Sequence, residues 1–303
     1  MKVRIGVGMA GSVARGTKGT PPPGLGDQVD AIADLRFDSL WLPEVLTAAA
    51  PDPLVTLAWV AGRTPKLKVG TTCLLPGRNV LRLAKQLATL DVVSGGRLLL
   101  CLVPGLTHEP ERSAIGVPTA GRGAAIDTAL PLLRRLWSGA EVTAELPGAT
   151  LQAVTLDPLP VQQPLEPWLG GNGPAALERC GRLSDGWLPA LTTPEEAAAG
   201  RQVIEAAAAA AGRSIDPEHF GVSIGWSETP ISDRARASVA ARSRGGDPDV
   251  LVPVGLDALR SVLEGFIAVG FSKFVVRPIS PPPPDRALAA LEDLAAAVLD
   301  LQT

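Results

Sequence analysis

Short apolar runs and longer stretches with a helical repeat alternate along the whole chain. An uninterrupted apolar run bounded by Gly or Pro predicts a buried strand, and apolar residues every three or four positions predict an amphipathic helix. Strands are expected at 3–9, 38–42, 67–75, 98–103, 168–170, 186–189, 220–226 and 273–276. Helices are expected at 27–35, 53–63, 80–93, 121–137, 174–183, 194–211, 256–269 and 285–301.

This alternation predicts a parallel sheet, because strands that are joined through helices cross over in the same right-handed sense. Eight such units favour closure into a (β/α)8 TIM barrel, in a single domain spanning residues 1–303. An open doubly wound sheet is the alternative, but it typically has fewer strands. Two stretches depart from the repeat. Residues 140–164 are expected to form an insertion with a short hairpin near the fifth strand, and the polar residues 227–250 a mobile excursion.

Composition excludes several classes of protein. The 303 residues are 46% hydrophobic, and 28 Lys and Arg against 31 Asp and Glu leave a net charge of −3, so no broad nucleic-acid footprint is expected. Apolar runs are too short to span a membrane. Three isolated cysteines in apolar surroundings argue against a disulfide framework or a metal cluster, and they favour a cytoplasmic location.

Candidate catalytic residues follow from the rule that barrel active sites lie at the carboxyl ends of the strands. Glu44 ends the second strand, and either a catalytic carboxylate or an ordinary salt-bridged loop residue fits that position. His108, with Glu109, follows the fourth strand and could transfer protons, although a loop histidine is more often simply solvated. Cys73 ends the third strand without a nearby base, which favours a buried thiol over a nucleophile. His219 precedes a strand, at the wrong end for catalysis.

The strongest local signal is the glycine-rich turn at 170–173. A strand runs through Trp168 into this turn and directly into a helix that begins at Pro174. Exposed amides and the positive end of a helix dipole form an anion site there, and the missing Gly-Lys-Ser/Thr excludes a Walker motif. A glycine-rich turn without a ligand is the alternative.

Four blocks together resemble the bacterial-luciferase-like monooxygenase family, including its branch that uses the deazaflavin coenzyme F420. They lie at 37–44, at 83–97, at 134–139 and at 170–187, and the resemblance covers nearly the whole chain. It implies a (β/α)8 barrel whose insertion covers the mouth. It also implies a non-prolyl cis peptide at the end of the third strand, which would be Thr72–Cys73 or Cys73–Leu74.

The resemblance implies that the cofactor phosphate binds the amides of residues 170–173, with the ring between Cys73 and the ends of strands one and four. Together with the strand-end reasoning, it gives a set of cofactor-binding residues and no metal site. The set is Met9, Glu44, Thr72, Cys73, Leu74, Pro104, Gly105, Gly170, Gly171, Asn172 and Gly173. Val45 replaces a histidine that is common in the family, and Leu106 replaces the acidic residue of its sugar-phosphate dehydrogenases, so that substrate class is not expected.

The expected function is therefore F420-dependent hydride transfer to or from a small organic molecule, with Glu44 or His108 moving the proton. Two alternatives remain open: an FMN-dependent monooxygenase that uses dioxygen, and a non-catalytic relative that binds flavin or another small ligand.

Assembly as a homodimer is also expected. The helices at 53–63 and 80–93 carry more apolar residues than one barrel wall can cover. The alternative is that long loops of the same chain cover the excess.

Overall fold

The computed structural model describes residues 1–9, 24–48, 50–146, 149–243 and 245–303. Eight parallel strands form one sheet in the order β8-β7-β4-β3-β2-β1-β10-β9. They are β1 (Arg4–Gly8), β2 (Ser39–Pro43), β3 (Lys68–Leu74), β4 (Leu98–Val103), β7 (Pro167–Leu169), β8 (Gly186–Trp187), β9 (Gly221–Trp226) and β10 (Lys273–Pro278). Parallel bridges from Trp187 to Phe220 and from Ala190 to Ser223 join the first strand of this order to the last.

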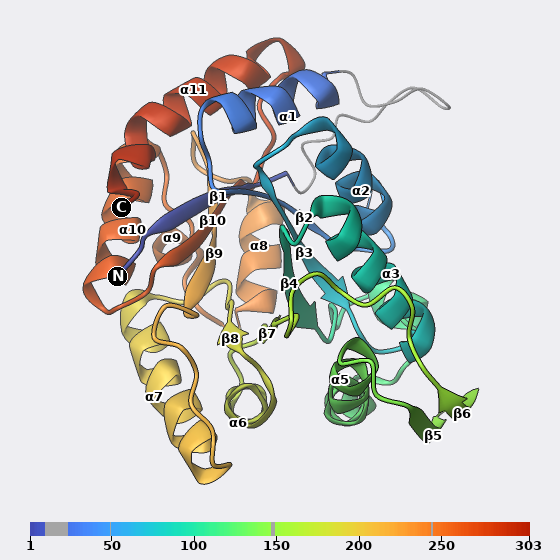
Figure 1. Ribbon diagram of the computed structural model, residues 1–303. Helices are drawn as coiled ribbons and strands as arrows, with labels where there is room; N and C mark the ends of the chain where they lie inside the picture. The colour runs from blue at the N-terminus through green and yellow to red at the C-terminus, as the bar shows by residue number, and fades with distance from the viewer. Residues whose placement is uncertain (10–23, 49, 147–148, 244) are drawn as a thin grey trace.

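Helices surround this sheet on its outer side (Figure 1). Eight of them alternate with the barrel strands, which confirms the predicted (β/α)8 barrel. They are α1 (Leu25–Asp34), α2 (Pro53–Arg63), α3 (Val80–Ser94), α5 (Arg122–Trp137), α6 (Pro174–Leu183), α7 (Pro194–Ala210), α10 (Leu256–Ala268) and α11 (Ala287–Val298). None of the helices in the described residues is long and apolar enough to cross a membrane.

The helix ends follow local sequence signals. Asp52 caps α2 by accepting a hydrogen bond from the Val55 amide, with Pro53 in the first helical position. A capping box joins Thr193 and Glu196 at the start of α7. Gly95 ends α3 in the left-handed conformation, which costs a glycine little.

The core has two layers. The larger layer lies between sheet and helices, and the smaller one fills the barrel with Trp41, Cys101, Leu188 and Val275. Trp41 fits because β3 presents Gly70 to it: a Cβ on Gly70 would lie 2.3 Å from the indole. The barrel interior is therefore a packed core at mid-height.

The insertion at 140–164 contains the predicted hairpin, formed by β5 (Val142–Leu146) and β6 (Ala149–Val154). Its predicted position over the mouth is wrong. Gln162 donates hydrogen bonds to Asp91, near the end of α3, and to the carbonyl of Leu98, at the start of β4. Since the insertion follows a helix and precedes a strand, it lies at the amino end of the barrel, opposite the mouth.

The predicted excursion at 227–250 is largely helical. It contains α8 (Asp233–Arg242) and α9 (Pro248–Leu251), and its motion stays a prediction. A further short helix, α4 (Glu111–Ala114), lies in the connection after β4 and was not predicted.

Polar residues of the blocks that carry the family resemblance join neighbouring elements. Arg97 donates hydrogen bonds to the carbonyls of Ala61 and Leu67. Arg134 pairs with Asp185 at 2.6 Å. These residues therefore hold neighbouring elements of the barrel together.

Candidate active site

Glu44 is held at the end of β2 by contacts on both carboxylate oxygens. One oxygen accepts a hydrogen bond from the Leu74 amide at 2.8 Å, and the other forms an ion pair with Arg78. The residue is only 7% exposed. The structure thus brings together three predicted site residues, Glu44, Cys73 and Leu74, but it uses the carboxylate to fix the end of β3. A role in proton transfer stays a prediction, and these contacts do not favour it.

Strand alternation separates the predicted cofactor residues into two groups. Met9 and Cys73 belong to the core between sheet and helices, so their side chains point away from the mouth. Thr72 and Leu74 have the opposite parity and face the interior. The expectation that a ring packs on the Cys73 side chain is therefore corrected. The side chains of β3 that face the interior, and could contact a ring there, are those of Thr72 and Leu74.

Cys73 is a buried free thiol, as predicted. Burial raises its pKa, and the nearby negative charge of Glu44 raises it further. Its sulfur lies 3.4 Å from a Glu44 oxygen. A thiol held protonated in this way is a poor nucleophile.

The expected non-prolyl cis peptide is wrong. Among the described residues, cis bonds precede only Pro110, Pro158 and Pro164. Both candidate bonds lie instead within β3, whose residues pair in continuous register with β4: Cys73 with Leu102, and Leu74 with Val103.

The connection after β4 is organised by Arg122, which is 1% exposed and which sequence reasoning missed. Its guanidinium donates to four backbone carbonyls, and each belongs to the segment that begins at Pro104. The acceptors are Pro104, Leu106, Arg112 and Val117. The predicted site residues Pro104 and Gly105 are thus fixed by a buried cation rather than by regular structure.

Glu111 joins this connection to the loop after β2. Its carboxylate accepts hydrogen bonds from the amides of Leu46 and Thr47 and from the Thr47 hydroxyl, at 2.8–3.0 Å. Burial opposes ionisation of Glu111, but these hydrogen bonds outweigh it and lower its pKa. His108 is exposed, and Glu109 pairs with Arg112. The predicted His108–Glu109 acid/base pair is therefore not formed.

Two side-chain hydrogen bonds fix the shape of the glycine-rich turn. The Trp187 indole donates to the Gly171 carbonyl at 2.9 Å, and the Asn172 amide donates to the Ala190 carbonyl at 2.8 Å. Gly171 has φ +103°, a conformation that side chains disfavour. No described carbonyl accepts a hydrogen bond from the backbone amides of Gly171, Asn172 or Gly173. They are therefore available to an anion at the start of α6. The prediction is corrected for Gly170, whose amide donates to the Leu102 carbonyl at 3.3 Å.

Arg277 is a site candidate that sequence reasoning missed. It lies near the carboxyl end of β10, and it has the same parity as Val275, which packs inside the barrel. The same rule that singled out Glu44, a charged residue directly after an apolar strand, could have found it.

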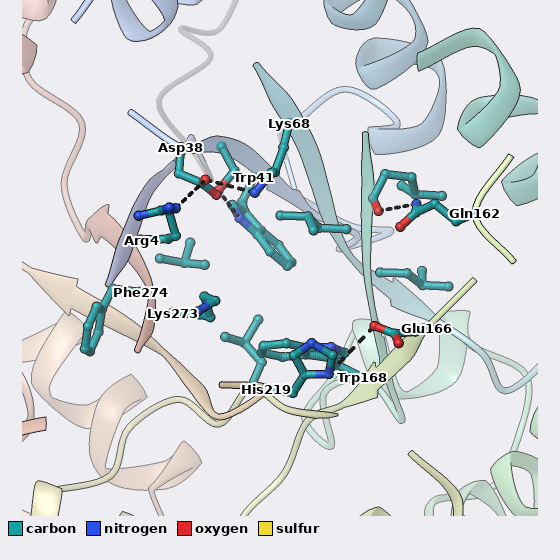
Figure 2. Close-up of a pocket in the computed structure, with 16 residues that line it drawn as sticks. Arg4, Asp38, Trp41, Lys68, Gln162, Glu166, Trp168, His219, Lys273 and Phe274 are labelled. Carbon is teal, nitrogen blue, oxygen red and sulfur yellow. Dashed lines mark hydrogen bonds and ion pairs between the residues drawn. The ribbon is translucent and has the colours of Figure 1, made fainter. Parts of the chain in front are cut away.

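A cavity of about 200 Å³ lies at the amino end of the barrel, opposite the mouth (Figure 2). Its aromatic wall is formed by Trp41, Trp168 and His219. Asp38 pairs there with Lys68 and Arg4, and His219 lies 3.7 Å from Glu166. The predicted surface position of His219 is corrected to a half-buried one, still at the amino end of the strands. Because these charges neutralise one another and carboxyl ends carry barrel chemistry, the mouth is the better candidate site.

The sequence profile described as luciferase-like monooxygenase matches residues 1–273. The F420-dependent glucose-6-phosphate dehydrogenase of Kineococcus radiotolerans is 30% identical over 178 residues, which is 55% of this chain and 52% of that protein. The 5,10-methylenetetrahydromethanopterin reductase of Methanolobus tindarius is 28% identical over 246 residues, 77% of this chain and 72% of the reductase. The match thus spans about half the length of the dehydrogenase.

Solved structures with the same fold include an F420-dependent secondary alcohol dehydrogenase in complex with an F420-acetone adduct. It has a TM-score of 0.79 at 19% identity, and the alignment covers 98% of this chain and 99% of that one. A monooxygenase from Streptomyces bottropensis has a TM-score of 0.78 at 21% identity, with 98% and 99% covered. At these identities the likeness establishes the fold.

Proposed function

Because the chain belongs to the luciferase-like monooxygenase family, we propose that it is an oxidoreductase that binds coenzyme F420 in the barrel mouth and exchanges hydride with a small organic substrate. The observation that carries this proposal is the turn at 171–173. Its amides are unpaired among the described residues, and Trp187 and Asn172 hold its shape. F420-dependent relatives support the choice of cofactor.

The residues present fit such a group. The amides of Gly171, Asn172 and Gly173 would hold its phosphate, helped by the dipole of α6. Thr72 and Leu74 would face its ring from β3. The deazaflavin, when bound, supplies the hydride chemistry, and the protein supplies position and electrostatics. Glu44 shapes the end of β3, which leaves His108, substrate or water to move the proton.

Titration with oxidised F420 and with FMN, followed by ligand fluorescence, tests the choice of cofactor. Tighter binding of F420 supports the proposal. Tighter binding of FMN would favour the flavin monooxygenase, and binding of neither would contradict both. Cofactor binding without turnover of any substrate would favour the non-catalytic relative.

Replacing Gly171 with alanine is expected to weaken cofactor binding about tenfold. A side chain at φ +103° forces the turn to change shape, and its Cβ would lie 3.1 Å from that of Ala176. Gly95→Ala is the matched control, since Gly95 also has positive φ (+67°) but lies at the amino end of the barrel. Both variants are expected to lose about 1 kcal/mol of stability, and only Gly171→Ala is expected to lose affinity. Equal affinities in the two variants would exclude this turn as the phosphate site.

The proposal includes assembly as a homodimer. Most apolar side chains of α2 and α3 are buried within the chain, but Val55 (73% exposed) and Trp59 (45% exposed) lie together on the outer face of α2. Val92 and Val93, near the end of α3, are exposed as well. Light scattering is expected to return twice the chain mass of 31.3 kDa, falling toward one chain in Trp59→Glu. A single-chain mass for the wild-type protein at all concentrations would contradict it.

A further inference from the structure

Arg277 places a guanidinium inside the barrel mouth. It is paired in register with Gly225 of β9, and its own strand also pairs with β1. A Cβ on Gly8 would lie 3.1 Å from the Cβ of Arg277, and one on Gly225 would lie 3.6 Å from its Nη2. The side chain therefore extends between the ends of β1 and β9, on the interior side of the sheet.

This guanidinium has no partner in the part of the chain that the structure describes. It forms no hydrogen bond and no ion pair with any residue in the described part of the chain. The remaining residues, 10–23, 49, 147–148 and 244, include no aspartate or glutamate in sequence. The chain therefore offers no carboxylate to neutralise Arg277, whereas the buried Arg122 and the half-buried Arg97 each have several carbonyl acceptors.

A second positive charge adds to the first. Burial, together with the positive charge of Arg242, lowers the pKa of Arg277 to about 10. Arg242 ends α8, in the connection that follows β9, and it too has no hydrogen bond or ion pair among the described residues. Arg242 is exposed, and its positive charge lies close enough to Arg277 to act on it, so the two cations add their charges near this part of the mouth.

We infer that Arg277, assisted by Arg242, binds an anionic group, a carboxylate, phosphate or sulfate, of the substrate. The inference rests on the proposed function, because the anionic group is assigned to the substrate of that oxidoreductase. A half-buried charge without a partner destabilises a protein, so a ligand that neutralises it explains its presence. A planar guanidinium suits oxoanions because it can donate two parallel hydrogen bonds.

The position of Arg277 separates this group from the proposed cofactor phosphate. The glycine-rich turn follows β7, and Arg277 lies near the carboxyl end of β10. Around the closed barrel these strands are separated by β8 and β9. An anion at Arg277 therefore lies across the mouth from the turn, where a substrate that faces the cofactor ring would extend.

Thermal unfolding of the full chain without cofactor tests the anion site directly. Inorganic phosphate and sulfate are compared with sodium chloride at matched ionic strength, for the wild type, Arg277→Met, Arg277→Lys and Arg236→Met. Arg236 is the control because it lies on α8 but is exposed and paired with Asp249. We expect the oxoanions to raise the Tm of the wild type and of Arg236→Met, to do so less in Arg277→Lys, and to raise that of Arg277→Met least, by only the part that anion binding at the turn 171–173 contributes.

The structure also predicts the direction in which Arg277→Met changes the unfolding temperature. Without oxoanions, Arg277→Met is expected to unfold at the same temperature as the wild type or at a higher one, because it removes an unneutralised charge. A lower Tm, an unchanged oxoanion response in Arg277→Met, or no response in the wild type would overturn the inference.

F420 titration of Arg277→Met then distinguishes the source of the anion. Unchanged cofactor affinity is expected. A tenfold loss of affinity would show that Arg277 binds the cofactor, and it would overturn the inference that Arg277 binds the substrate. Failure of F420 and FMN to bind the wild type, with the oxoanion response intact, would overturn the proposed function alone.

Discussion

Arg122→Met is expected to lower the free energy of unfolding by about 3 kcal/mol. Hydrogen bonds from a charged donor contribute about 1.5–3 kcal/mol each, and four carbonyls lose their donor, while the cost of burying the charge is recovered. The segment 104–117 should then leave its position beside the mouth, so cofactor binding should weaken by more than tenfold. Denaturant unfolding and ligand fluorescence measure the two effects.

Arg182→Met is the matched control for this prediction. Arg182 is 49% exposed on α6 and contacts Asp127 at 3.2 Å, so its loss should change stability by less than about 0.5 kcal/mol. If both variants were equally stable, the hydrogen bonds of Arg122 would not hold the connection after β4.

Glu44→Gln is expected to cost about 2 kcal/mol and to lower turnover because the end of β3 shifts. Removing one charge of a fully buried pair costs about 3–5 kcal/mol, and the smaller value is expected since Arg78 is 22% exposed. His108→Ala is the comparison, because an exposed loop residue should change stability by less than about 0.5 kcal/mol.

Turnover with saturating cofactor separates the roles of these two residues. Lower activity in Glu44→Gln together with lower stability fits a structural carboxylate. A loss of activity at unchanged stability would instead make Glu44 a catalytic group, as the sequence alone suggested. Loss of activity in His108→Ala at unchanged stability would identify the proton donor, and full activity would leave substrate or water in that role.

The arrangement of strands and helices was predictable because each element carries its own signal. The helix at 53–63, with Asp52 and Pro53 at its start, has the predicted bounds. The direction of side chains in the strands was not predictable. A parallel strand inside a barrel is apolar on both faces, so the pattern does not reveal that Cys73 faces the helices and Thr72 the interior.

The sequence contains signals that could have placed the insertion at 140–164 correctly and identified Arg277 as a site candidate. Connections from helix to strand lie at the amino end of a barrel, so the order of elements already places 140–164 away from the mouth. Arg277 follows an apolar strand as Glu44 does. The role of Arg122 could not be foreseen, because its four acceptors are backbone carbonyls, which no side-chain pattern in the sequence marks.

The central claim is that the mouth, and not the cavity at the amino end, holds the cofactor. Hydrogen exchange of the wild-type chain with and without oxidised F420 tests it most directly. Slower exchange is expected at the amides of residues 170–176 and at the strand ends 72–75 and 103–106, with no change at residues 98–100 and 218–220. Protection at the amino-end cavity with none at 170–176 would contradict the claim.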